Sequence, residues 1–216
     1  MFKSIFRLAL IACTLVVPAV HANLITNGSF EDNNVSQNTW QWFTADNVNG
    51  WSGSNIEIWD QFHGVSAVDG SQFAELNAHA NSGQQFSIFQ TFETEANGLY
   101  NLSFYYQARQ SESERFEVAV TADSGSIFEQ VMDDHVRNHW SMFTSQFMAV
   151  SDKTTLIFTS LTPYSGTIGN FIDAISVTAV TNSFTPQASV NEPGTLAIAI
   201  LGLSALLFMR FRRKHD

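Results

Sequence analysis

Residues 23–180 alternate apolar and polar side chains with a period of two, and the 3.6-residue period of an amphipathic helix is nearly absent there. In the run 99–106, Leu102, Phe104 and Tyr106 fall on one face and the residues between them on the other. One apolar face and one wet face are typical of an antiparallel strand that covers a core. The runs expected to form strands are 24–30, 55–59, 72–76, 86–92, 99–108, 116–121, 141–149, 154–159 and 171–180.

The spacing of these runs predicts the fold class. They are separated by clusters of Asn, Gly, Ser and Asp, which favour turns. The 19 Phe and 5 Trp of the chain supply a large aromatic core. We therefore predict a single all-β domain over 23–180, an antiparallel two-sheet jelly-roll sandwich. The one helix that we expect lies at about 129–136.

The charge of this domain is more negative than the value of −10 for the whole chain. Between residues 23 and 180, the only basic residues are Arg109, Arg115, Arg137 and Lys153, against 18 Asp and Glu, which gives −14. Binding nucleic acid requires Lys and Arg to neutralise phosphates. The balance therefore predicts no nucleic-acid partner, argues against other anionic polymers and favours a neutral sugar.

The first 22 residues predict a secretory signal peptide. Lys3 and Arg7 precede an apolar stretch, and small residues at Val20 and Ala22 suit cleavage after Ala22. The only cysteine, Cys13, lies in a lipobox-like Leu-Ile-Ala-Cys, so a lipoprotein is an alternative. Cleavage after Ala22 leaves a domain without disulfides or a cysteine nucleophile.

The last 25 residues predict a membrane-spanning sorting segment. Residues 194–209 carry no charge and, as a helix, span about 24 Å, close to a ~30 Å hydrocarbon core. The basic residues in 210–214 place the C-terminus in the cytoplasm by the positive-inside rule. A buried core helix is the alternative, and residues 181–191 form a polar linker before this segment.

The motif around Glu192 and Pro193, followed by the apolar helix and the basic tail, resembles the PEP-CTERM sorting signal of Gram-negative bacteria. This signal also ends some proteins named as ice-binding. The resemblance implies export, recognition by an exosortase-type membrane protease, and delivery to the cell surface or extracellular matrix. Asn191 stands where the family usually has proline.

Several motifs in order resemble the galactose-binding-like jelly rolls. They are Asn-Leu-Ile-Thr-Asn-Gly-Ser-Phe-Glu at 23–31, Gly-Trp at 50–51, Asp-Gly-Ser-Gln-Phe-Ala-Glu-Leu-Asn at 69–77, Phe-Gln-Thr-Phe at 89–92, Gly-Leu-Tyr-Asn-Leu-Ser-Phe at 98–104 and Phe-Ile-Asp-Ala-Ile-Ser-Val at 171–177. That group includes carbohydrate-binding modules and a plant cell-wall family of unknown activity. The resemblance implies a structural calcium held by Glu31 and Asp173 with main-chain carbonyls.

The sequence offers little for catalysis. A Gly-x-Ser-x-Gly elbow is absent, and the His135/His139 pair lacks the Glu that zinc proteases use as base. Glycoside hydrolysis needs two carboxylates, for which Glu57, Asp60 and Glu75 are possible. We therefore expect no enzyme, with a glycoside hydrolase as a third alternative.

Binding has more support, because sugar sites combine an aromatic platform with polar side chains. We predict that Trp40, Trp42, Trp59 and Arg109 contribute to a polysaccharide site. Core packing is the alternative for each Trp, as expected for Trp51, and a salt bridge to Glu112 or Glu114 is the alternative for Arg109. The sequence thus predicts an exported, noncatalytic module that binds polysaccharide, such as the producer's own exopolysaccharide. A structural or adhesion protein of the matrix is the competing prediction, and ice binding ranks last.

Overall fold

The computed structural model describes residues 22–79 and 83–180. The predicted signal peptide up to residue 21, the linker and the sorting segment lie outside these residues. Within them, no helix combines the length and the apolar character that a membrane span requires.

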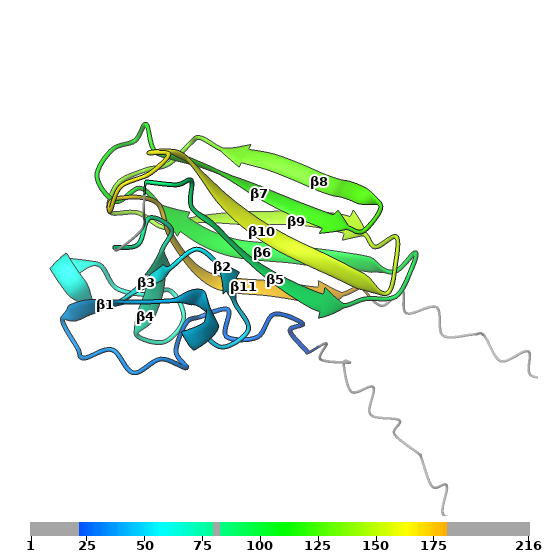
Figure 1. Cartoon of the computed structure of the whole chain (residues 1–216), viewed down its shortest axis with the longest axis horizontal. Helices are drawn as coiled ribbons and strands as arrows, with labels where there is room; N and C mark the ends of the chain where they lie inside the picture. Colours follow the sequence, from blue (N-terminus) through cyan, green and yellow to red (C-terminus); the bar gives the residue numbers. More distant parts are fainter. Residues whose placement is uncertain (1–21, 80–82, 181–216) are drawn as a thin grey trace, which may run out of the picture. The chain divides into compact units, whose positions relative to one another are not determined.

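The described chain forms two antiparallel sheets stacked face to face (Figure 1). The six-stranded sheet has the order β1 (Thr39–Phe43), β3 (Ile56–Asp60), β4 (Gln72–Glu75), β11 (Phe171–Ala179), β6 (Leu99–Gln107) and β9 (Ser141–Met148). The five-stranded sheet has the order β2 (Ser52–Gly53), β5 (Ser87–Glu93), β10 (Lys153–Thr162), β7 (Arg115–Ala122) and β8 (Gly125–Met132). Two short 3₁₀ helices, η1 (Ala45–Asn47) and η2 (Phe62–Gly64), interrupt the connections. This arrangement confirms the predicted all-β sandwich.

The core lies between the sheets and is built from the apolar positions of each alternating strand. Phe104 of β6 packs edge-to-face on Phe158 of β10, with ring centroids 5.1 Å apart, and both side chains are fully buried. Trp51 stacks on Phe30 at 5.4 Å and donates its ring N–H to the Asn27 carbonyl, so its predicted core position is confirmed. Edge-to-face and offset-stacked pairs are favoured geometries of aromatic rings.

The predicted helix at 129–136 is wrong, because residues 125–132 form strand β8. A short turn after β7 brings Gly125 opposite Ala122 and sets Glu129 opposite Ala119. Glu and Gln favour helices in isolation, but the neighbouring edge of β7 offers main-chain partners along the whole segment. Tertiary pairing therefore overrides the local preference.

The predicted strand at 24–30 is also wrong, although its position is informative. The segment consists of turns that run alongside β11. The Leu24 N–H donates to the Val177 carbonyl at 2.8 Å, and the Ile175 N–H donates to the Gly28 carbonyl at 3.0 Å. A side chain at Gly28 would collide with the Ile175 carbonyl oxygen, so this close approach requires glycine. The two ends of the domain therefore lie together.

A second aromatic cluster covers the outer face of the six-stranded sheet. Trp59, Phe73 and Phe171 from three neighbouring strands are buried there and pack against one another at 4.9 to 6.0 Å. Phe62, Val65, Ala67 and Trp140 cover them. Because of this layer, β3 is buried on both faces. The candidate functional site described below lies on this outer layer.

Candidate functional site

One row of side chains crosses the outer face of the six-stranded sheet. Directly opposed residues of antiparallel strands project from the same face. The pairing therefore aligns, strand by strand, Trp42, Glu57, Glu75, Phe171 and Gln107. The neighbouring row aligns Trp40, Trp59 and Phe73. Two neighbouring carboxylates, Glu57 and Glu75, thus lie among aromatic side chains in this outer layer.

Arg109 lies above these rows and contacts both. Its guanidinium carbon is 4.7 Å from the centre of the Trp59 ring, which is cation–π distance. Its Nη1 donates to the two carboxylate oxygens of Glu75 at 2.6 and 2.8 Å and to the Thr167 carbonyl at 2.8 Å. The Arg109 side chain keeps 26% of its surface exposed, whereas that of Glu75 is fully buried. The guanidinium is therefore held by Glu75 on the side of the sheet and exposed to solvent on its other side.

The two buried carboxylates are engaged by donors of the protein itself. Glu75 also accepts the Gly169 N–H at 2.7 Å. Glu57 accepts the Trp59 ring N–H at 2.9 Å and the His79 N–H at 3.1 Å. Burial raises the pKa of the Glu75 carboxyl well above its usual value, and Arg109 opposes that rise. These contacts indicate that the acid pair positions Trp59 and Arg109.

The loop that carries Arg109 is held by Glu114. This buried carboxylate accepts the main-chain N–H groups of Arg109, Gln110 and Ser111 at 2.7 to 2.8 Å. At the start of the loop, Ala108 forms a parallel β-bridge with Arg137. The bridge brings the segment after β8 beside the loop after β6, so Arg109 and Arg137 reach the same end of the sandwich.

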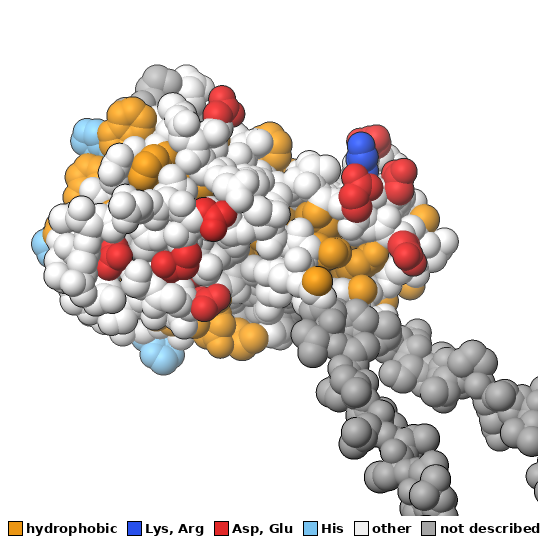
Figure 2. All heavy atoms as spheres, turned by 90° about the horizontal axis from the view of Figure 1, so that it is seen from below, with side chains coloured by type: hydrophobic (Ala, Val, Ile, Leu, Met, Phe, Trp, Pro, Cys, Tyr) orange, Lys and Arg blue, Asp and Glu red, His pale blue; other side chains and the backbone are white. Residues whose placement is uncertain are grey.

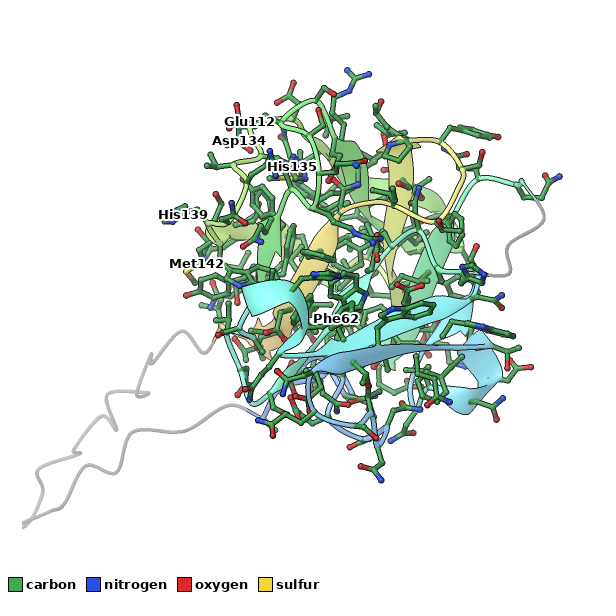
Figure 3. The ribbon with its side chains drawn as sticks, turned by 90° about the vertical axis from the view of Figure 1, so that its left-hand side faces the viewer. Phe62, Glu112, Asp134, His135, His139 and Met142 are labelled. Atoms are coloured by element: carbon green, nitrogen blue, oxygen red, sulfur yellow. The ribbon has the colours of Figure 1, made fainter. Side chains whose placement is uncertain are left out.

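A cavity of about 270 Å³ opens at this place. Its lining residues are Trp59, His63, Val65, Arg109, Gln110, Arg137, Asn138, Ile168 and Phe171. A second cavity of about 390 Å³ shares Gln110 and Ile168 with the first, so the two are adjacent. Figure 3 shows this end of the sandwich, where Glu112 and Asp134 come from neighbouring loops above Phe62 of η2. The first cavity is slightly smaller than typical drug-sized pockets of roughly 300–1,000 Å³ and suits a small group such as one sugar ring.

The structure brings two of the four predicted binding residues into this cavity. Trp59 and Arg109 touch there, but the Trp59 side chain is only 2% exposed, so its ring is packed into the cavity wall and offers no open platform. The salt bridge of Arg109 is formed with Glu75 and neither Glu112 nor Glu114.

Trp40 and Trp42 lie on the same outer face but do not line the cavity. Each is 38% exposed, and they belong to edge strand β1, which is not among the strands expected from the sequence. Trp40 also contacts the His79 ring at 5.8 Å. Their two-residue spacing on one strand makes them an open aromatic platform at the sheet edge.

The sequence did not point to the other cavity residues. They come from four separate segments and are His63, Val65, Gln110, Arg137, Asn138, Ile168 and Phe171. For Arg137, the one available signal was the scarcity of basic residues in the domain.

The predicted calcium ligands Glu31 and Asp173 come to one loop, residues 68–72. Glu31 Oε1 accepts the Ser71 and Gln72 N–H groups at 2.7 and 2.6 Å. Asp173 Oδ2 accepts the Val68 and Asp69 N–H groups at 2.6 and 3.1 Å. Burial raises the pKa of the Asp173 carboxyl to about 7, although these N–H groups lower it.

Two carboxylates with about four lone-pair positions each retain acceptor capacity for a cation. The contacts of these oxygens in the structure are with hydrogen-bond donors of the protein, which for Asp173 include the Ala174 N–H at 2.6 Å. Among the described residues, no group of three or more His, Cys, Asp or Glu is placed to hold a metal ion. Calcium therefore stays a prediction.

His135 is buried close to the cavity end without forming part of it. Its ring packs edge-on against Tyr106 and Phe116 at 5.0 and 5.4 Å, and neither ring nitrogen has a hydrogen-bond partner among the described residues. Burial lowers the pKa of His135 to about 4, against the opposing effect of Asp134 and Asp133. The neutral imidazole is enclosed by aromatic rings, and among the described residues no group of three or more His, Cys, Asp or Glu is placed to bind zinc with it.

Solved structures with the same fold include carbohydrate-binding proteins. The TmCBM61 module in complex with β-1,4-galactotriose aligns with 74% of this chain and 99% of its own, at a TM-score of 0.50 and 14% identity. The α-L-arabinofuranosidase MgGH51 in its arabinose-bound form aligns with 74% of this chain and 27% of its own, also at a TM-score of 0.50 and 14% identity. At this identity the likeness shows a shared sandwich fold.

Sequence comparisons find a relative and, separately, the family. Halomucin of Haloquadratum walsbyi is 31% identical over 203 residues, which cover 88% of this chain and 2% of halomucin. This chain therefore spans only a small part of that relative. The sequence profile of the family described as "Protein of unknown function (DUF642)" matches residues 23–178. The chain thus belongs to the DUF642 family.

Proposed function

We propose that this domain binds polysaccharide without transforming it, at the cavity over Trp59 and along the outer face toward Trp42. The observation that carries the proposal is the Arg109 guanidinium, which is fixed by Glu75 beside the Trp59 ring and left partly open. The fold is shared with a carbohydrate-binding module in complex with a galactotriose.

The chemistry of the surface suits a sugar. Pyranose rings present C–H groups to aromatic faces and hydroxyl groups to amide and guanidinium donors. The cavity supplies Phe171 and Ile168 as apolar lining and Arg109, Gln110 and Asn138 as polar groups. The exposed Trp40 and Trp42 would extend contact to neighbouring residues of a chain.

The burial and hydrogen bonding of Glu57 and Glu75 favour binding over hydrolysis. Glycosidases place two carboxyl groups about 5 or 6.5–9.5 Å apart on either side of the scissile bond. Glu57 and Glu75 lie side by side beneath the surface, and neither lines the cavity. Their oxygens accept hydrogen bonds from protein donors, so they are not presented to a sugar.

A glycan array followed by titration calorimetry on the best polysaccharide tests the proposal. We expect a dissociation constant below the millimolar range and an unchanged ligand after prolonged incubation. No binding at millimolar ligand would contradict the proposal, and released oligosaccharides would favour a hydrolase.

A matrix protein that acts through protein contacts is the second candidate. Met142 and Met148 on edge strand β9 are each 54% exposed, which is typical of adaptable contact surfaces. Crosslinked protein partners in the native matrix, together with an absence of glycan affinity, would favour this function.

We also propose that the chain is exported and processed at the PEP-CTERM-like motif around Glu192 and Pro193 by an exosortase-type protease. The support is the order of motif, apolar stretch and basic tail in the sequence. Mass spectrometry of the extracellular form tests this. A mature species that retains the C-terminal segment would contradict it.

A further inference from the structure

The cavity has a charge pattern opposite to that of the domain around it. Arg109 and Arg137 line it, whereas no Asp or Glu does. Residues 23–180 contain only four Lys and Arg against 18 Asp and Glu. Figure 2 illustrates the general pattern on one face, where acidic side chains are spread widely and basic ones are nearly absent. Half of the basic residues of the domain therefore converge on one small cavity.

Both guanidinium groups have donors to spare. Arg109 uses only Nη1 for its contacts with Glu75 and Thr167, which leaves Nη2 and Nε without a hydrogen bond among the described residues. Arg137 is exposed, and it forms no salt bridge within the part of the chain that the structure describes. The remaining N–H groups of Arg109 and the unpaired guanidinium of Arg137 are therefore available to a ligand.

The position of Arg137 is set by its main chain. The bridge between Arg137 and Ala108 ties its backbone to the loop of Arg109, and the Ala108 N–H bonds to the Val136 carbonyl at 3.4 Å. Glu114 fixes the same loop from inside. The two arginines are therefore held on one rim, where they can approach one anion together.

We propose that this cavity selects an acidic sugar, whose carboxylate or sulfate is held by Arg109 and Arg137 while its ring lies against the apolar lining. Guanidinium groups bind such anions through two parallel N–H···O bonds, which are stronger than bonds between neutral groups. This inference rests on the proposed function and narrows its substrate class. It departs from the neutral sugar that the average charge of the domain favours.

The average charge does not decide the matter, because charges act over a short range in salt. At an ionic strength near 0.15 M the Debye length is about 8 Å, so exposed acids farther away than this are largely screened. Guanidinium groups in direct contact with an anion are screened much less. The net charge of −14 should slow the approach of an acidic polymer, while the cavity holds it once bound.

The experiment compares matched polymers at constant ionic strength of about 0.15 M. Polygalacturonate is measured against its methyl ester, and dextran sulfate against dextran, by isothermal titration calorimetry with the domain 23–180 and with the Arg137→Gln variant. The Arg115→Gln variant is the matched control. It removes the same charge from an exposed position on β7 of the other sheet.

We expect an acidic polymer to bind at least about tenfold more tightly than its neutral counterpart, and Arg137→Gln to abolish most of that preference. Arg115→Gln should change it less than about twofold. The affinities for polygalacturonate and for dextran sulfate, each relative to its neutral counterpart, tell whether carboxylate or sulfate is preferred. Equal binding of acidic and neutral polymers, or equal effects of the two variants, would overturn the inference and leave polysaccharide binding standing. An absence of binding to any glycan, in these arms and on the array, would overturn the proposed function as well.

Discussion

The guanidinium of Arg109 and the indole of Trp59 lie 4.7 Å apart, in contact across 50 residues of sequence. Trp59 comes from β3, and Arg109 comes from the loop after β6. Strands β4 and β11 lie between β3 and β6 in the sheet. Glu75 on β4, between β3 and β11, receives the guanidinium. Arg109 is therefore held in place on the outer face of the six-stranded sheet by contacts within the protein.

Replacing Trp42 with alanine should weaken polysaccharide binding by about tenfold without unfolding the domain. The ring is 38% exposed on an edge strand, so its removal costs contact with ligand more than core packing. Calorimetry gives the affinity, and urea unfolding gives the stability. Met148→Ala, on the opposite edge strand β9, is the control and should bind like the parent. Equal affinity of the two variants would remove Trp42 from the site.

Glu114→Gln should lower the free energy of unfolding by about 1–3 kcal/mol and also reduce binding. Glutamine replaces one acceptor oxygen with an NH₂ group, so it cannot accept all three N–H groups that fix the loop of Arg109. The exposed Glu112 lies two residues away, and Glu112→Gln is the matched control. If the Glu114→Gln variant bound polysaccharide as tightly as the parent, the Glu114 carboxylate would not be what positions Arg109.

His135 should make the domain less stable as the pH falls from about 6.5 to about 4. Its pKa is about 4 when folded and near 6.5 when unfolded, so in this window the unfolded chain binds a proton that the folded chain does not. The free energy of unfolding therefore decreases with decreasing pH. The contribution should amount to about 1–2 kcal/mol between pH 7 and pH 5.

The variant His135→Phe isolates this effect. Phenylalanine suits the aromatic neighbours Tyr106 and Phe116 and leaves no unpartnered nitrogen buried. The stability difference between variant and parent, from urea unfolding at each pH, should grow as the pH drops to 5. If the free energies of unfolding of parent and variant changed equally with pH, His135 would not titrate between pH 6.5 and pH 4.

Calcium should raise the melting temperature of the domain, and EDTA should reverse the rise. An ion that binds only the folded state at 100 times its dissociation constant adds about 2.7 kcal/mol. For a domain of this size that corresponds to about 5–10 °C. Glu31→Gln should abolish the effect, because it removes one of the two charges that meet at the loop 68–72.

The exposed Glu129 on β8 provides a control variant, Glu129→Gln, which should respond to calcium like the parent. A melting temperature that calcium and EDTA leave unchanged in the parent would contradict the calcium prediction. In that case hydrogen bonds from the protein alone, from the loop 68–72 and from the Ala174 N–H, hold Glu31 and Asp173.

The sequence predicted the sandwich because alternation is a local property that each strand displays by itself. Phe104 and Tyr106 read as inward-facing from their own run, and the structure buries both. The strand at Thr39–Phe43 was missed because an Asn- and Gln-rich stretch precedes it, although Trp, Phe and Thr favour strands. The segment 129–132 was misread because its partner β7 decides its conformation.

The site was harder to predict, since its contacts join distant segments. Trp59 and Arg109 could be singled out by residue type and by the scarcity of cations, but not their contact. Glu75, 34 residues before Arg109, was expected only as an acid among many. Arg137 joins them through a single β-bridge to Ala108, which follows from the fold as a whole and has no local pattern.

The pairing of the first described segment with the last strand has a mechanical consequence. Leu24 and Gly28 bond to Val177 and Ile175 in antiparallel order, so both ends of the domain leave from the same side of this short seam. Tension applied between the two ends would act at once on these hydrogen bonds and on the pairing of Thr178 and Ala179 with β6. The shorter contact, that of residues 23–28, should therefore open before β11 leaves the sheet, and the outer face of the six-stranded sheet should stay intact until then. Stretching in an optical trap would show this as a small early extension followed by a separate, larger one.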